Sequence, residues 1–169
     1  MSAHFRPWLP ALALALCAGC GDGATQPLPG ELTDADVSRL ARATSGWTYY
    51  RNRPDTLLKS AGSGHAETRL RTRYNATAAT QLDATGKVRA GASFADSSLI
   101  VKELIIGSTL NRYAVMMKMR GATSASGGWL WAYYAPDGSA QISITGRGTA
   151  CVGCHSTGID HTRMNDSHP

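Results

Sequence analysis

Two cysteines and a histidine stand together in the sequence, as Cys151-Val152-Gly153-Cys154-His155. The spacing C-x-x-C-H is typical of covalent attachment of c-type haem. Two thiols three residues apart can add to the two vinyl groups at one edge of a porphyrin, and the histidine that follows can bind the iron. The sequence therefore predicts one covalent haem c, attached at Cys151 and Cys154, with His155 as the metal ligand.

Two other kinds of site use cysteines at this spacing. A thioredoxin-like redox pair belongs to a βαβ context, which the pattern of this chain does not predict. A zinc site needs a further pair of ligands, and only His155 and His161 lie near the cysteines in sequence. Haem attachment is therefore the favoured interpretation, with zinc binding and disulfide exchange as the alternatives.

The position of the motif bears on the sixth ligand of the iron. Only 14 residues follow His155, and the candidates among them, His161, Met164 and His168, lie close to the proximal ligand in sequence. This favours a five-coordinate haem whose open position can bind a small molecule. A simple electron-transfer cytochrome would need a sixth ligand, which the sequence does not identify.

The N-terminal segment resembles an export signal. An apolar run of nine residues, Trp8 to Leu16, is too short for a bilayer, which needs about 20 residues, but it has the length of a signal h-region. The following Cys17-Ala18-Gly19-Cys20 is similar to the lipobox of bacterial lipoproteins. We expect a lipoprotein-type signal peptide over residues 1–19 and lipidation at Cys20. The alternative is an ordinary cleaved signal.

The expected mature protein is an exported lipoprotein, anchored to a membrane and facing the periplasm. Residues 20–32, which contain Gly and Pro, are expected to form a flexible tether to a single haem domain over residues 33–169. Cleavage would remove Arg6 alone among the charged side chains and lower the formal charge from +5 to +4. This mild excess, without clustered aromatic residues, does not indicate a nucleic-acid partner.

The body of the domain is expected to be rich in strands. Its hydrophobic content of 43% allows a buried core. Thr33 can cap a helix over Thr33–Ala43, and Asn75 can cap a short one over Ala76–Leu82. The segments that read as strands are 47–50, 68–74, 98–106, 112–119, 129–134 and 141–145, with a loop-rich stretch over 51–67. No long helical period separates the strands, so we predict an α+β fold, mainly an antiparallel sheet with a few short helices.

One strand carries a charge on an apolar face. Lys102 alternates in phase with Ile100, Leu104 and Ile106, so these side chains are expected on one face of the sheet. A lysine there must find a partner, extend to solvent or serve a function. His65, in a glycine-rich loop, is expected at the surface.

Several short motifs extend the pattern beyond the cysteines. They are Arg71-Thr72-Arg73-Tyr74-Asn75-Ala76, then Phe94-Ala95-Asp96-Ser97 with Val101-Lys102-Glu103, then Val115-Met116-Met117-Lys118, Gly128-Trp129 and Ile159-Asp160. In this order, and with C-x-x-C-H at the end, they resemble the cytochrome P-460 family and its relatives, the cytochromes c′-beta. The resemblance covers roughly residues 47–165. Ala95 and Ser97 depart from the Pro and Gly of that pattern, which predicts a different loop shape before Lys102.

The resemblance implies a function and further site residues. In P-460 enzymes the lysine at the position of Lys102 is joined covalently to the porphyrin, and the arginine at Arg71 lies near the distal pocket. Both are therefore expected to take part in catalysis. The implied reaction is oxidation of hydroxylamine or a related small nitrogen compound, with a soluble cytochrome c as electron acceptor, and the implied assembly is a homodimer. The alternatives are a c′-beta-like protein that binds nitric oxide without turnover and a simple electron-transfer cytochrome.

Overall fold

A computed structural model describes residues 32–167 of the chain. The expected signal peptide (1–19), the lipidation site Cys20 and nearly all of the expected tether (20–32) lie outside these residues, as does His168. Among the residues described, no helix is both long enough and apolar enough to cross a bilayer.

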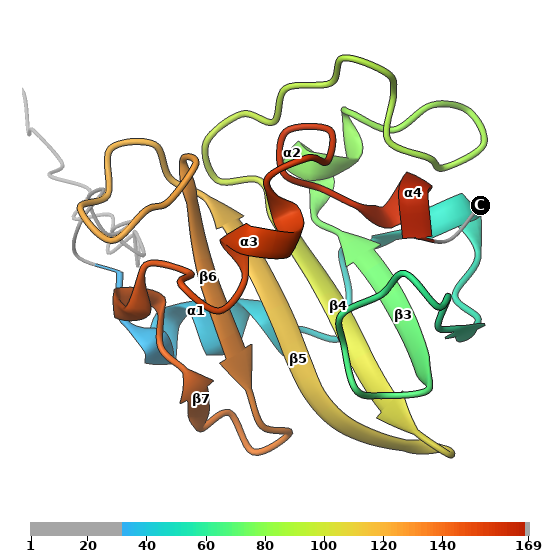
Figure 1. Cartoon of the computed structure of the whole chain (residues 1–169), viewed down its shortest axis with the longest axis horizontal. Coiled ribbons are helices and arrows are strands. Elements are labelled where there is room, and N and C mark those ends of the chain that lie inside the picture. The colour runs from blue at the N-terminus through green and yellow to red at the C-terminus, as the bar shows by residue number, and fades with distance from the viewer. Residues whose placement is uncertain (1–31, 168–169) are drawn as a thin grey trace, which may run out of the picture.

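Seven strands form one antiparallel sheet, as predicted (Figure 1). The strand order is β1-β3-β4-β5-β6-β7, and β2 also pairs with β3. A tight hairpin joins β4 to β5 through Gly107, whose positive φ of 62° suits the turn, whereas a long connection that contains a short helix joins β3 to β4. The strands are β1 (Thr48–Tyr49), β2 (Leu57–Leu58), β3 (Arg69–Tyr74), β4 (Leu99–Ile106), β5 (Thr109–Lys118), β6 (Trp129–Tyr134) and β7 (Ala140–Ile142).

The helices are short and lie between or beside the strands. They are α1 (Asp34–Ala41), α2 (Ala76–Ala79), α3 (Val152–His155) and α4 (Met164–Ser167), with single 3-10 turns η1 (Tyr50–Asn52) and η2 (Ile144–Gly146). The predicted caps are confirmed. Thr33 and Asp36 form a reciprocal capping box at the start of α1, and Asn75 accepts a hydrogen bond of 2.9 Å from the Ala78 amide.

Several predicted elements are shorter than expected: α1 ends at Ala41 rather than Ala43, and β1 covers Thr48–Tyr49 rather than 47–50. Two further cases have a clear local cause. The helix after Asn75 ends at Ala79 rather than Leu82, because the amides of Gln81 and Leu82 donate to carbonyls three residues back and tighten the last turn. The last predicted strand ends at Ile142. There Ser143 accepts a hydrogen bond from the Thr145 amide and turns the chain into η2.

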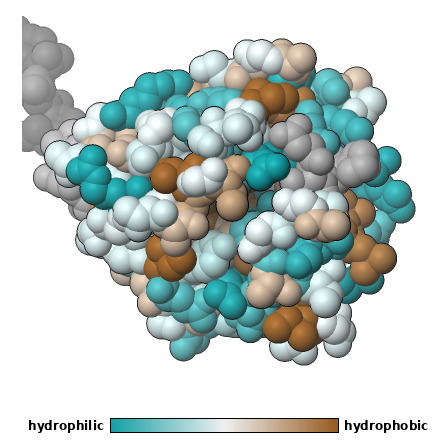
Figure 2. Space-filling model, viewed as in Figure 1, coloured by the Kyte–Doolittle hydropathy of each residue, from teal (hydrophilic) through white to brown (hydrophobic). Residues whose placement is uncertain are grey.

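The sheet separates two hydrophobic cores. On one face α1 packs its Val37 and Ala41 against Val101, Val115 and Leu130. On the other face Leu70, Ile100, Leu104 and Trp131 pack beneath the segment that carries α3, so α1 and α3 cover opposite faces (Figure 1). The outer surface on the α3 side is mostly hydrophilic, with apolar residues scattered singly over it (Figure 2).

Candidate haem site

A pocket lies between the sheet and α3, with a cavity volume of about 100 Å³, and it is partly open to solvent. Its floor includes a row of register partners on neighbouring strands, in which Thr72 pairs with Lys102, Lys102 with Ala114, and Ala114 with Tyr133. The roof is formed by Cys151, Cys154 and His155 together with residues 162–164, and the loop 62–65 forms one wall. The fold therefore brings Lys102 and the C-x-x-C-H motif into one cavity.

His155 is oriented by the backbone. Its Nδ1 lies 2.7 Å from the carbonyl oxygen of His161, which fixes the tautomer with Nδ1 as the donor. Burial lowers the pKa of His155 below its ordinary value of 6.5, and the positive charges of Lys102 and Arg163 act in the same direction. The ring of Trp131 packs edge-on at 5.0 Å between centroids. The imidazole is therefore neutral at pH 7, with its Nε2 lone pair available to a metal.

The two thiols lie at the N-cap of α3 (Cys151) and within the helix (Cys154). Cys151 is half-buried and Cys154 is exposed, and neither is in a disulfide. Burial, followed by the neighbouring Cys154, raises the pKa of Cys151. Two thiols and an imidazole at the edge of a cavity whose floor includes Ile100, Met116 and Trp131 are the donor set that haem c requires. The residues present therefore fit a covalently held haem.

The structure gives less support to the two alternatives, zinc binding and thioredoxin-like disulfide exchange. Among the described residues, no group of three or more His, Cys, Asp or Glu side chains is gathered so that it could hold a metal ion. The sheet is antiparallel throughout, so α3 is not part of a βαβ unit.

Lys102 projects from β4 into this pocket, on the same face as Ile100 and Leu104, as predicted. Burial, with a contribution from the positive charge of Arg163, lowers the pKa of Lys102 from 10.5 to about 8. Its side chain keeps partial access to solvent through the cavity. Among the described residues, none forms a hydrogen bond or an ion pair with its amine. Within the part of the chain that the structure describes, Lys102 thus places its amine in the pocket without an ion-pair or hydrogen-bond partner.

Sequence reasoning missed a polar pair on the pocket wall. The Nδ1 atom of His65 lies 2.8 Å from the hydroxyl oxygen of Tyr133, and both residues line the pocket rather than the outer surface. Burial raises the pKa of Tyr133 to about 12. The alternation of β6 could have indicated Tyr133, because it shares a face with the buried Trp131. No short-range signal connects it to His65, which is 68 residues away.

The structure describes two of the three candidates for a sixth iron ligand, Met164 and His161. The sulfur of Met164 lines the pocket and lies 3.1 Å from the hydroxyl oxygen of Thr72. The ring of His161 lies against the backbone of Gly127 and edge-on to Trp131.

Arg71 is not brought to the pocket. In the register of β3 and β4 it pairs with Glu103, whereas Thr72 pairs with Lys102, so Arg71 lies on the opposite face of the sheet. There its Nε donates to Glu103 Oε2 at 2.6 Å, and its guanidinium lies 5.9 Å from the ring centre of Tyr49. The structure therefore separates Arg71 from Lys102 and the cysteine motif.

The loop before Lys102 keeps a glycine-like conformation although it lacks glycine. Ser97 has a φ of 69°, in the left-handed region, and its amide donates to the Lys118 carbonyl. Asn75 spans the same turn, donating to the Ser97 carbonyl and accepting from the Leu99 amide at 3.0 Å. Serine at this position therefore strains the turn, which backbone and Asn75 hydrogen bonds hold in place.

A comparison with protein-family models supports a haem site that contains Lys102 and the C-x-x-C-H motif. The family model for Cytochrome P460 matches residues 65–162, more than half of the chain, and this range contains Lys102 and the whole C-x-x-C-H motif. No curated protein and no solved structure gives a significant match. The chain belongs to the cytochrome P-460 family of haem proteins.

Proposed function

We propose that the protein is a monohaem cytochrome c of the P-460 type that oxidises hydroxylamine or a related small nitrogen compound. Cys151 and Cys154 would hold the haem, and His155 Nε2 would bind the iron. The observation that carries this proposal is that these three residues and Lys102 line one pocket. The bound haem would supply a redox-active iron with an open coordination position.

Other pocket residues are proposed to exclude water and to transfer protons. The apolar side chains of Ile100, Met116 and Trp131 limit the entry of water above the sheet. Removing electrons from hydroxylamine also removes N–H and O–H protons, so the reaction needs a proton acceptor and an electron acceptor. The hydrogen-bonded pair of His65 and Tyr133 offers a route for protons out of the pocket. A soluble cytochrome c is the proposed acceptor for the electrons.

Lys102 is proposed as a third covalent attachment. A lysine whose pKa is near 8 is partly neutral at physiological pH, and the neutral amine is the form that can bond to carbon. The new N–C bond would replace one N–H bond of the amine and one C–H bond of the porphyrin. The two protons and two electrons released would pass to an oxidant of the peroxide class.

Haem staining of protein matured in a host with cytochrome c assembly tests the proposal. Wild-type protein is expected to retain haem under denaturing conditions, and the double variant Cys151→Ser/Cys154→Ser is expected to lose it. Cys20→Ser is the matched control, because it removes a cysteine that is not part of the C-x-x-C-H motif. Absence of covalent haem from the wild type would refute the proposal.

Two further measurements distinguish the reactions. Peptide mapping should find Lys102 joined to the haem peptide, and the reduced protein should have a red-shifted Soret band. An ordinary five-coordinate spectrum that changes only with nitric oxide would instead indicate a gas-binding protein. A six-coordinate spectrum insensitive to ligands would indicate electron transfer.

The cellular setting is part of the proposal. Export fits covalent haem attachment, which takes place outside the cytoplasm, and lipidation of Cys20 would anchor the domain to a membrane facing the periplasm. Loss of membrane association in Cys20→Ser would support the anchor. A homodimer is proposed from the family resemblance, and no nucleic-acid partner is proposed.

A further inference from the structure

A buried ion pair lies behind the segment that follows the haem motif. Lys118, at the end of β5, places its Nζ 2.6 Å from Asp160 Oδ1, and both side chains are largely buried. The same ammonium group lies 4.7 Å from the ring centre of Trp129. Because removing both charges from water is costly, a pair in this position needs a structural or functional reason.

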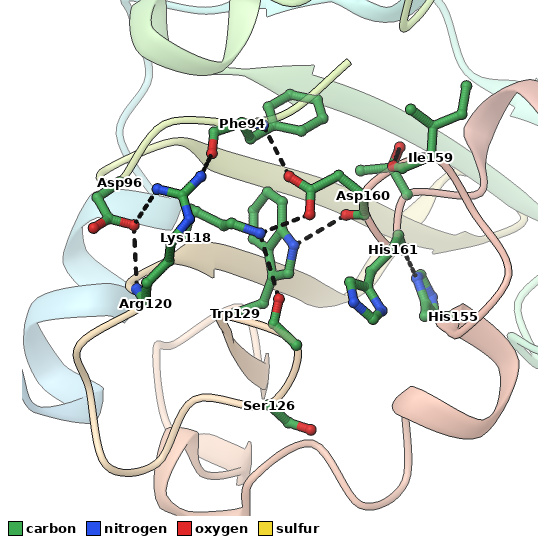
Figure 3. A network of polar contacts seen from close by, with 12 residues as sticks. Phe94, Asp96, Lys118, Arg120, Ser126, Trp129, His155, Ile159, Asp160 and His161 are labelled. Carbon is green, nitrogen blue, oxygen red and sulfur yellow. Dashed lines mark hydrogen bonds and ion pairs between the residues drawn. The ribbon is translucent and has the colours of Figure 1, made fainter. Parts of the chain in front are cut away.

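Asp160 ties three parts of the chain together (Figure 3). Its second carboxylate oxygen accepts a hydrogen bond of 2.8 Å from the Phe94 amide, and its backbone carbonyl accepts one of 3.0 Å from the Trp129 indole. With Lys118, this gives Asp160 contacts to β5, to β6 and to the loop before β4. The backbone at Asp160 is therefore fixed from three directions.

The next residue carries the acceptor for the haem ligand. Asp160 and His161 are consecutive residues with positive φ, 43° and 67°, a strained conformation that surrounding contacts must maintain. This turn directs the His161 carbonyl to Nδ1 of His155 at 2.7 Å (Figure 3). The His161 ring fits against Gly127, where a Cβ atom would lie 2.4 Å from its Nε2.

We propose that Lys118 and Asp160 are positioning residues that set the strength of the hydrogen bond from His155 to the His161 carbonyl, and through it the electronic state of the iron. The inference rests on the proposed role of His155 as iron ligand. A strong hydrogen bond at Nδ1 makes an imidazole a better electron donor, which lowers the reduction potential of the bound metal. The ion pair would thus favour the ferric state, the form proposed to accept electrons from the substrate.

The test uses the haem-loaded protein and two variants, Asp160→Asn and Lys118→Met. We expect both to retain covalent haem, to show a lower Fe–His stretching frequency in resonance Raman spectra of the ferrous form, and to have a higher reduction potential. Lys118→Arg keeps the charge and should restore both readouts toward the wild-type values. A purely structural pair would alter thermal stability and leave these two readouts unchanged.

Asp96→Asn is the matched control. Asp96 pairs with Arg120 at 3.1 Å in the same region, but both side chains are about half exposed and neither touches Asp160 (Figure 3). It should leave the Fe–His frequency and the potential unchanged. If Asp160→Asn does not accumulate, Asp160→Glu, which retains the charge but displaces it, tests the same contact.

The outcomes separate the two proposals. Wild-type protein without covalent haem would refute the proposed function. Haem-loaded Asp160→Asn and Lys118→Met with the wild-type Fe–His frequency and potential would refute the positioning role alone.

Discussion

Consecutive residues of β4 carry opposite kinds of charge to opposite faces of the sheet. Glu103, on the α1 side, pairs with Arg71 and with Arg73, whose NH2 group lies 3.4 Å from Glu103 Oε1. Lys102, on the α3 side, faces the pocket, and the part of the chain that the structure describes offers its amine no partner.

The residues around the Glu103–Arg73 pair also differ from those around Lys102. Arg73 also stacks over Trp47, with 4.5 Å from its Cζ to the ring centre, and donates to the Ala41 and Ala43 carbonyls. The pocket around Lys102 mixes apolar side chains with neutral polar ones and the cationic Arg163, and carboxylates are absent from its described lining. Glu103 and Arg73 thus have counter-charges within the protein, whereas the Lys102 amine has none among the described residues. The predictions below test this contrast.

Glu103→Gln should have the largest effect. It leaves the nearly buried Arg73 without its counter-charge, and loss of one partner of a buried ion pair costs about 3–5 kcal/mol. Because the carbonyl contacts of Arg73 remain, we expect the lower end of that range in urea unfolding. Asp96→Asn, in an exposed pair, should cost less than about 1 kcal/mol. Equal losses would contradict the contrast.

Lys102→Met should act in the opposite direction in protein in which Cys151 and Cys154 are replaced by serine, so that no haem is attached. A folded-state pKa of about 8 against 10.5 means that the charged amine costs about 3 kcal/mol below pH 8. The unfolded chain binds more protons between these values, so the cost disappears as the pH rises through 10.5. The stability gain of the methionine variant should therefore be full at pH 7 and absent near pH 11. A gain that does not vary with pH would exclude the charge as its cause.

Arg71→Gln should have a smaller effect on stability, about 1 kcal/mol, because its side chain is 34% exposed and Glu103 keeps Arg73. The absorption spectrum and nitric oxide binding of the haem-loaded variant should match the wild type. A change in either would place Arg71 in the distal site that the family resemblance implied, and would show that the two faces are not separate in function.

Ser97→Gly should have the smallest effect and the opposite sign. It relieves the left-handed strain at φ 69°, offset by the greater freedom of glycine in the unfolded chain, for a net gain of about 0.5–1 kcal/mol. Ser97 lies before β4 begins and does not line the pocket. Thermal stability should therefore rise while the haem spectrum stays unchanged. A spectral change would mean that the turn shape controls Lys102.

Local patterns predicted much of the fold. Alternation of side chains predicted the strand Trp129–Tyr134 and the placement of Lys102 with Ile100 and Leu104. Capping chemistry predicted both helix caps. Ile106, expected on the same face, is 55% exposed at the last position of β4, beyond a bulge at which β5 carries one extra residue between the partners of Leu104 and Ile105. A bulge depends on pairing with a neighbouring strand, which the sequence of one strand does not specify.

Long-range register decided the rest of the site. Whether Arg71 or Thr72 shares a face with Lys102 depends on the pairing of β3 with β4, and a shift of one residue exchanges them. The contacts from His65 to Tyr133 and from Lys118 to Asp160 join residues far apart in sequence. The cysteine motif was evident from spacing alone because its members are adjacent along the chain.

The segment after α3 also has a consequence for how the protein is made. Asp160 and Met164 fasten it over the pocket, through Lys118 and Thr72, so the folded chain closes one side of the space that the proposed haem would occupy. An assembly enzyme needs both thiols on an accessible stretch of chain. Attachment would therefore come before this segment docks, and the haem would be enclosed as the last part of the domain folds.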